Sequence, residues 1–238
     1  MIDRAVSITR VAAVEAHHDS RVWPWAEANR AAIATNWQRR IADKPRMFNG
    51  RVLLLCDLSV DEDVCRSRYF ETDYADFIGW IDAGYPDPGV ANGFAMGALR
   101  GSDGAYICGV MGDHTVNAGR VYFAAGTPDQ SDIRQGGRVD LATSLTRELT
   151  EETGLVAADF EVADDWIVVQ HWPTVALMRH VTLAVTAEVG AERIRGLIKQ
   201  QDDQELSDVV VVRGPDDINP GTMPLYLQSF FRWSFAQR

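Results

Sequence analysis

Cysteine is scarce in this chain, and the few cysteines present are not arranged in pairs. Cys56, Cys65 and Cys108 lie far apart, and no C-x-x-C motif occurs. Neither a disulfide framework nor a zinc site is indicated, because both are recognised by closely spaced thiols. Reduced thiols are the simpler interpretation, and they favour a cytoplasmic protein.

Long hydrophobic runs are also missing. The N-terminus carries Asp3 and Arg4 and lacks the uninterrupted apolar segment that a signal peptide contains. No stretch approaches the roughly 20 apolar residues that cross a membrane as a helix. We therefore expect neither a signal peptide nor a membrane span.

Positively charged residues are also outnumbered by negatively charged ones. The net charge is −11, and only Lys44 and Lys199 of the 23 basic residues are lysines. An acidic protein repels phosphate backbones and anionic lipids, so neither a nucleic acid nor a membrane is expected as a partner. Binding of an anionic small molecule would need a metal ion or local arginines to reverse the field.

The length of 238 residues, 46% of them hydrophobic, suffices for one large domain or two small ones. Residues 84–89, which read Gly-Tyr-Pro-Asp-Pro-Gly, form the clearest boundary because Gly and Pro punctuate regular structure. We therefore predict an N-terminal α+β subdomain over residues 1–88 and a second domain over residues 89–238.

Hydrophobic periodicity and turn residues predict alternating strands and helices. Strands are expected at residues 6–14, 51–58, 64–72, 93–99, 105–111, 120–124, 166–170, 178–189 and 209–212. Helices are expected at 24–41, 74–83, 141–153, 191–199 and from 224 onward. This order, with its hairpins, predicts an α/β (α+β) sandwich in which a mixed β-sheet lies between helices.

The most informative stretch is residues 147–155, which read Arg-Glu-Leu-Thr-Glu-Glu-Thr-Gly-Leu. Glu148, Glu151 and Glu152 share one face of the predicted helix, where like charges destabilise each other by a few tenths of a kcal/mol per pair. Divalent Mg²⁺ prefers carboxylate oxygens and would turn that repulsion into binding. Arg147 is placed to hold a carboxylate, and Gly154 is a typical helix stop.

This stretch resembles the R-E-U-x-E-E-x-G-U signature of the Nudix hydrolases, where U is a bulky aliphatic residue. The resemblance implies a hydrolase that cleaves nucleoside diphosphates linked to another group. It further implies Mg²⁺ or Mn²⁺ bound by Glu148, Glu151 and Glu152, with Arg147 orienting these carboxylates and water attacking phosphorus. The alternative interpretation is a solvated acidic helix face.

The upstream half of the signature departs from the family pattern. At the usual spacing from Arg147, Val139 and Ile133 replace the expected glutamate and glycine. A second match begins at Gly126, with Asp129 and Asp132 at the two glutamate positions, and makes residues 133–139 an insertion. Gly126 would then let the backbone approach phosphate or metal, and Asp129 or Asp132 would contact the substrate. Alternatively, the two aspartates simply form turns.

A catalytic base is harder to assign. In several Nudix enzymes a carboxylate from a late loop activates the water, and Asp203 or Glu205 would fill that role here. Glu148 and Glu152 compete for it, and an exposed acidic loop is the alternative interpretation of residues 202–205. The histidines show no metal-ligand spacing, so solvent-exposed or core positions are expected for them. Substrate contact is the alternative for His114, which lies in a loop before the third expected strand of the second domain.

Two functions remain open from the sequence. The first is a pyrophosphohydrolase acting on a small nucleotide derivative such as a nucleotide sugar or ADP-ribose. The insertion and the extra N-terminal subdomain loosely resemble Nudix members that hydrolyse UDP-sugars. The second is a Nudix-like sensor that binds such a ligand without cleaving it. A homodimer is expected from the family resemblance alone.

Overall fold

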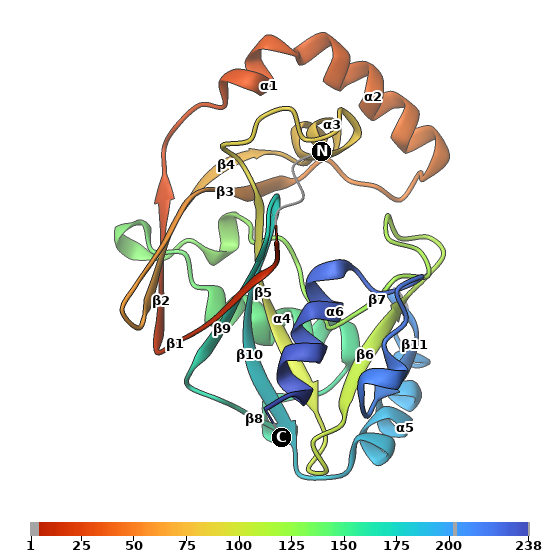
Figure 1. The fold of residues 1–238 in the computed structure, drawn as a ribbon. Helices are drawn as coiled ribbons and strands as arrows, with labels where there is room; N and C mark the ends of the chain where they lie inside the picture. The colour runs from red at the N-terminus through yellow and green to blue at the C-terminus, as the bar shows by residue number, and fades with distance from the viewer. Residues whose placement is uncertain (1–4, 202–203, 238) are drawn as a thin grey trace.

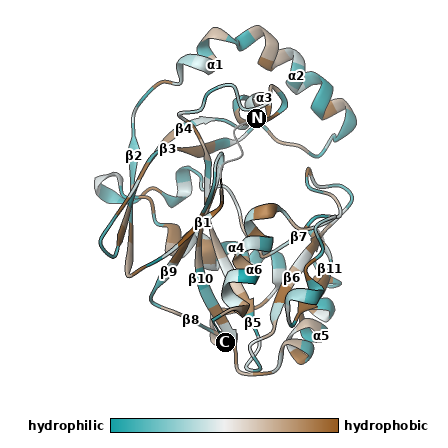
Figure 2. Ribbon diagram, viewed as in Figure 1, coloured by the Kyte–Doolittle hydropathy of each residue, from teal (hydrophilic) through white to brown (hydrophobic). Residues whose placement is uncertain are grey.

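The computed structural model describes residues 5–201 and 204–237, which form two β-sheets with six α-helices (Figure 1). The predicted mixed α+β class is confirmed. A larger sheet with α4, α5 and α6 occupies one end of the molecule, and a smaller sheet with α1, α2 and α3 occupies the other. Figure 2 shows hydrophobic residues gathered along the strands of the larger sheet.

The larger sheet has eight strands in the order β1-β9-β10-β5-β6-β11, with β7 paired to β6 and β8 to β10. Only the β5–β10 pair is parallel, so the sheet is mixed. The strands are β1 (Ser7–Val11), β5 (Asn92–Arg100), β6 (Tyr106–Met111), β7 (Val121–Tyr122), β8 (Phe160–Val162), β9 (Trp166–His171), β10 (Thr174–Leu183) and β11 (Leu206–Val212).

Helices cover both faces of this sheet. On one face, Leu145 of α4 (Leu141–Thr153) packs at Gly97 of β5, and Gly190 of α5 (Ala187–Ile198) lies against Ile107 of β6. On the other face, rings of α6 (Leu225–Phe235) pack on Phe94 and Tyr106. The predicted sandwich of a mixed sheet between helices is therefore present, and it places the acidic helix α4 on β5.

The smaller sheet has the order β2-β4-β3, with strands β2 (Ala13–Asp19), β3 (Arg51–Asp61) and β4 (Val64–Asp73). The helices α1 (Pro24–Ala28), α2 (Arg30–Asp43) and α3 (Tyr74–Asp82) accompany it. Its core holds Trp23, Ile33, Phe70 and Trp80, so these tryptophans are packing residues as their apolar surroundings predict.

Two elements near the N-terminus differ from the sequence prediction. The strand expected at 6–14 is two strands, because the chain crosses between sheets at Ala12: Val11 pairs with Trp166 and Ala13 with Val64. The helix expected at 24–41 breaks at Asn29, whose side-chain amide donates to the Trp25 carbonyl at 2.7 Å. Such local side-chain bonds compete with helix continuation.

Later boundaries differ as well. The strand expected at 178–189 begins earlier, at Thr174, and ends at Leu183. The residues after Leu183 are still apolar, but they lead into α5, which begins at Ala187 after the N-cap Thr186. The strand expected at 120–124 is only two residues long, and β8 was not predicted. The hairpin at 101–104, the β3–β4 pair and the bounds of α4 agree with prediction.

The division at residue 88 does not describe every contact. Strand β1 lies before that boundary, yet it pairs with β9 in the larger sheet. Leu55 of β3 also exchanges backbone hydrogen bonds of 2.9 Å with Ala91. The smaller sheet is thus joined to residues of the second domain by backbone hydrogen bonds. The boundary predicted from Gly and Pro residues gave no sign of these bonds. Within the described residues, no helix is both long and apolar enough for a membrane crossing.

An ion pair between α2 and α3 supports a stability prediction. Asp82 accepts from Arg40 Nε and from Asn36 Nδ2, each at 2.8 Å, and Arg39 lies 3.5 Å away. The hydrogen bond from Arg40 is the main reason that the pKa of Asp82 is lowered, against the opposing effect of burial. Its stabilising effect is therefore present above the unfolded pKa of about 3.9 and is lost as pH falls through the lower folded pKa.

We expect Asp82→Asn to lower the free energy of unfolding by about 1 kcal/mol at pH 7 and by much less near pH 3. Urea unfolding at the two pH values measures the difference. Asp43→Asn, at an exposed site on the neighbouring helix α2, should change little at either pH. An equal deficit for Asp82→Asn at both pH values would contradict the assignment.

Candidate functional site

Helix α4 presents the predicted acidic residues at one end of the larger sheet. Asp140 accepts from the backbone N–H of Thr143 at 3.3 Å and caps the start, as predicted. Gly154, with φ of 72°, ends the helix in the left-handed conformation that favours glycine. Leu145 and Leu149 are completely buried against the sheet, which sets the rotation of the helix and hence the direction of the glutamates.

The three glutamates of α4 have different environments. The Glu151 side chain is 58% exposed, that of Glu148 is 15% exposed, and Glu152 is buried. Glu152 Oε1 accepts from the backbone N–H of Ala125 at 3.0 Å. Its other oxygen, Oε2, is buried and has no hydrogen-bond partner among the described residues. A buried acceptor without a partner is costly, and a bound cation or water at this oxygen would satisfy it.

Arg147 is shared among several carboxylates. Its Nη1 lies 2.7 Å from Glu148 Oε1 and 3.3 Å from Glu151 Oε2, and its Nη2 lies 3.3 Å from Asp132 Oδ2. Asp132 is almost completely buried, so this ion pair joins the loop before α4 to the helix itself. These contacts are those that an orienting role for Arg147 requires.

Burial and mutual repulsion raise the pKa values of the inner glutamates. Burial raises the pKa of Glu148 to about 7, although the Arg147 charge opposes it. Burial, followed by the nearby carboxylates of Glu205 and Glu148, raises the pKa of Glu152 well above its usual value. One guanidinium thus leaves the negative charge of the cluster uncompensated, an arrangement typical of sites that bind cations or transfer protons.

Metal binding by this cluster stays a prediction. Over residues 5–201 and 204–237, no three His, Cys, Asp or Glu side chains are gathered into a group that holds a metal ion. Arg147 pairs with Glu148, and the Glu151 side chain is mostly exposed. The donor chemistry nevertheless fits Mg²⁺ or Mn²⁺, since carboxylate oxygens are hard ligands and Glu152 Oε2 is unused.

The glycine of the upstream match lies against the cluster. A Cβ atom on Gly126 would be 2.4 Å from the carboxyl carbon of Glu148, so any other residue would displace one of the two. Gly126 therefore permits the Glu148 carboxylate to approach the backbone closely. This contact does not test the predicted approach of phosphate or metal at Gly126.

Asp129 and Asp132 form a turn. Asp129 Oδ1 accepts from the Ser131 N–H at 2.6 Å, and Asp132 Oδ2 accepts from the Asp129 N–H at 3.1 Å. The turn interpretation therefore describes both residues, and Asp132 has the additional ion pair with Arg147. A direct contact of either with substrate stays a prediction.

The smaller sheet holds both ends of the segment that precedes α4. The Leu53 N–H of β3 donates to the Pro128 carbonyl at 2.7 Å, and the Val139 N–H donates to the Ala16 carbonyl of β2 at 2.8 Å. The predicted insertion at 133–139 is thus anchored to the N-terminal strands. Sequence reasoning missed these bonds because they join residues about 75 and 120 positions apart, with no local signal.

The candidate bases are placed differently. Asp203 lies outside the described residues. Glu205 precedes β11, its backbone carbonyl accepts from the Gly112 N–H at 2.8 Å, and its carboxylate is near enough to raise the pKa of Glu148 and Glu152. Glu205 therefore lies near the inner glutamates, and its role as the base stays a prediction. Glu205 and His114 line one cavity together.

Two cavities adjoin the cluster. The first, of about 620 Å³, lies between β5, the loop at 125–127 and the start of α6, and Phe94, Arg120 and Tyr226 are among its lining residues. The second, of about 330 Å³, contains Glu205 and His114. The cavities share Asn117, Tyr122 and Ala125, and Ala125 is the residue that donates to Glu152.

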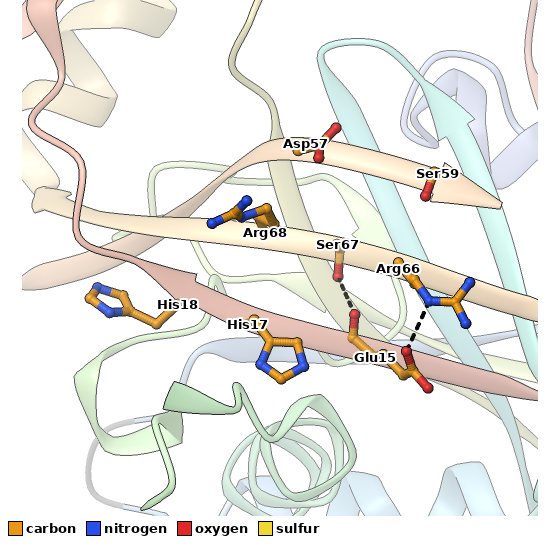
Figure 3. Close-up of a pocket in the computed structure, with 8 residues that line it drawn as sticks. All are labelled: Glu15, His17, His18, Asp57, Ser59, Arg66, Ser67 and Arg68. Carbon is orange, nitrogen blue, oxygen red and sulfur yellow. Dashed lines mark hydrogen bonds and ion pairs between the residues drawn. The ribbon is translucent and has the colours of Figure 1, made fainter. Parts of the chain in front are cut away.

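A further cavity of about 580 Å³ lies on the smaller sheet (Figure 3). Its lining residues come from β2, β3 and β4, and both of its arginines pair with carboxylates. Arg66 lies 3.1 Å from Glu15, and Arg68 lies 3.4 Å from Asp19. We assign this cavity to a solvated polar sheet face because its arginines already have acidic partners.

Comparison with known proteins gives limited information. No family model matches the chain, and no curated protein matches it. Among solved structures, a Nudix hydrolase from M. smegmatis, RenU, is similar at 14% identity, covering 61% of this chain and 86% of that one with a TM-score of 0.39. A MutT protein from Methanosarcina mazei Go1 is similar at 14% identity, covering 62% and 94% with a TM-score of 0.37. Likeness at this level assigns no activity to the chain.

The unpartnered Glu152 supports a prediction about stability. Replacing Glu152 with Gln keeps an acceptor for Ala125 and removes a buried carboxylate, so the metal-free protein should become more stable, by about 1–2 kcal/mol. Mn²⁺ should raise the melting temperature of the wild type and have little effect on Glu152→Gln.

Thermal unfolding with EDTA or with Mn²⁺ measures both effects. Glu161→Gln, at an exposed position of β8, is the matched control and should respond to Mn²⁺ as the wild type does. If Mn²⁺ stabilised Glu152→Gln as strongly as the wild type, Glu152 would not be a ligand.

Proposed function

We propose that this protein is a metal-dependent pyrophosphohydrolase of the Nudix type. Its substrate is a small nucleoside diphosphate derivative, such as a nucleotide sugar or ADP-ribose, and water cleaves the diphosphate bridge by attack on phosphorus. The observation that carries the proposal is the buried Glu152, which has one carboxylate oxygen without a partner and lies near the largely buried Glu148. Ala125, which donates to Glu152, lines both of the neighbouring cavities. The residue pattern of α4 supports the family assignment.

The residues of the chain suit the chemistry of phosphoanhydride cleavage. Glu148, Glu151 and Glu152 would hold Mg²⁺ or Mn²⁺, which would supply charge neutralisation at the phosphate oxygens. Arg147 fixes Glu148 and is itself fixed by Asp132, which limits the movement of the cluster. Glu148, whose pKa is raised to about 7 by burial before metal binds, is one candidate to take a proton from the attacking water.

Glu205 is the second candidate for the base, because it faces the same glutamates from the loop before β11. In either case the new P–O bond forms from water, the bridging P–O bond breaks, and the proton of the water passes to the carboxylate. The two products are phosphate monoesters, of which one retains the nucleoside.

One observation favours the alternative, a Nudix-like sensor that binds without cleaving. Arg147 pairs with both Glu148 and Glu151, and a cation would have to displace it from at least one of them. A sensor would tolerate this pairing, whereas a hydrolase must release it when metal binds. The two functions differ in turnover, which is directly measurable.

The test is phosphate release, after coupling to a phosphatase, from a panel of nucleotide sugars and ADP-ribose with Mg²⁺ or Mn²⁺. We expect turnover of at least one compound and a loss of about 100-fold or more in kcat for Glu152→Gln, because a metal ligand is removed. Glu161→Gln should retain wild-type activity. Tight binding without turnover of any compound would favour the sensor.

A further inference from the structure

The loop between α2 and β3 reaches the candidate site from the N-terminal subdomain. Arg46, Met47 and Phe48 line the second cavity together with His114 and Glu205. Tyr74, the first residue of α3, lines it as well. Residues distant from α4 in the sequence therefore form a wall beside the acidic cluster.

This loop is attached to the opposite wall by Lys44. The Lys44 ammonium donates to the backbone carbonyls of Asp113, at 3.3 Å, and Thr115. These carbonyls flank His114, so one side chain spans the opening between the two subdomains. The other end of the loop is bonded within the N-terminal subdomain: the N–H groups of Tyr74 and Ala75 donate to the Gly50 carbonyl and the Asn49 side chain, each at 2.8 Å. The loop is thus held at both ends.

Phe48 is an exposed apolar residue at the second cavity, where it is free to contact a bound molecule. Its side chain is 81% exposed, the largest fraction among the exposed large hydrophobic residues of the described chain. Tyr85 and Leu225, also exposed, lie at the first cavity. Isolated exposed apolar residues are ordinary, but these three lie on cavities that meet beside Glu152.

Tyr74 connects the wall to the cluster. Burial raises its pKa, and the nearby carboxylate of Glu205 raises it further. Burial raises the pKa of the Tyr122 phenol, and the nearby carboxylates of Glu152 and Glu205 raise it further. The second cavity therefore runs from the N-terminal wall to Glu205 and to Ala125, whose backbone N–H donates to Glu152.

We propose that the N-terminal subdomain completes the substrate site: residues 46–48, positioned by Lys44, form the wall that contacts the group attached to the far side of the diphosphate. Phe48 is the specificity-determining contact, and Lys44 is a positioning residue. This inference rests on the proposed function for the location of the diphosphate. The nucleoside occupies the larger first cavity, and the second group, a sugar, occupies the smaller one.

The test compares two hydrolysis-resistant probes that differ only in the second group. Isothermal calorimetry with Mn²⁺ measures binding of α,β-methylene nucleoside diphosphates and of the same compounds carrying a terminal sugar, in adenosine and uridine forms. We expect the sugar to improve binding by the wild type about tenfold. Phe48→Ala should remove most of that increment, because the contact with the sugar is deleted. It should not change the affinity for the nucleoside diphosphate that lacks the sugar.

Lys44 variants separate positioning from a general loss of structure. Lys44→Met should lose the sugar increment, since it cannot donate to Asp113 and Thr115, whereas Lys44→Arg should retain it. Val22→Ala is the matched control because Val22 is 68% exposed in the same subdomain and lines neither cavity. It should bind both probes as the wild type does.

The outcomes distinguish this inference from the proposed hydrolysis. Retention of the sugar increment by Phe48→Ala, or its absence in the wild type, overturns the inference even if the protein hydrolyses nucleotide sugars. Failure of the wild type to bind any probe also overturns it. An increment lost in Phe48→Ala and Lys44→Met, without turnover of natural compounds, supports the inference and refutes the hydrolase.

Discussion

A single guanidinium shared among three carboxylates determines how this site is built. Arg147 contacts Glu148 and Glu151 on its own helix and Asp132 on the preceding loop. Losing the contact with the buried Asp132 would leave a buried carboxylate without its partner, which is strongly destabilising, whereas the pair with the exposed Glu151 contributes little. The loop at 126–132 and α4 are therefore coupled, and Glu152 is held where its second oxygen has no partner.

The N-terminal subdomain contributes to this arrangement and is not a separate appendage. Strands β3 and β2 bond Pro128 and Val139, the two ends of the segment that carries Asp132 and the predicted insertion. Insertions of this kind are tolerated when their ends stay close, because the entropy of loop closure grows only slowly with length. Backbone bonds from another sheet then replace the short connection as the means of positioning Asp132 against Arg147. The same subdomain supplies Lys44 and Phe48 to the second cavity.

Local signals predicted the elements whose structure is determined locally. The apolar stripe of Leu141, Leu145 and Leu149, the capping Asp140 and the terminal Gly154 predicted α4 correctly, because each acts within about one turn. Prediction failed where tertiary contacts decide. An apolar run through Ala12 looks like one strand, yet its halves pair in different sheets. The apolar residues after Leu183 continue into α5, so hydrophobicity alone did not locate the end of β10.

By itself the sequence determined the composition of the acidic helix, the mixed α+β class and the choice of candidate groups, since these depend on residue types and short spacings. The tertiary structure alone decided that Glu152 is buried, that Arg147 joins Asp132 to Glu148, and that Glu205 faces the same cluster. It also decided that residues 46–48 lie beside His114. These facts depend on which distant segments meet, and such encounters result from sheet pairing and core packing over the whole chain, which no local pattern encodes.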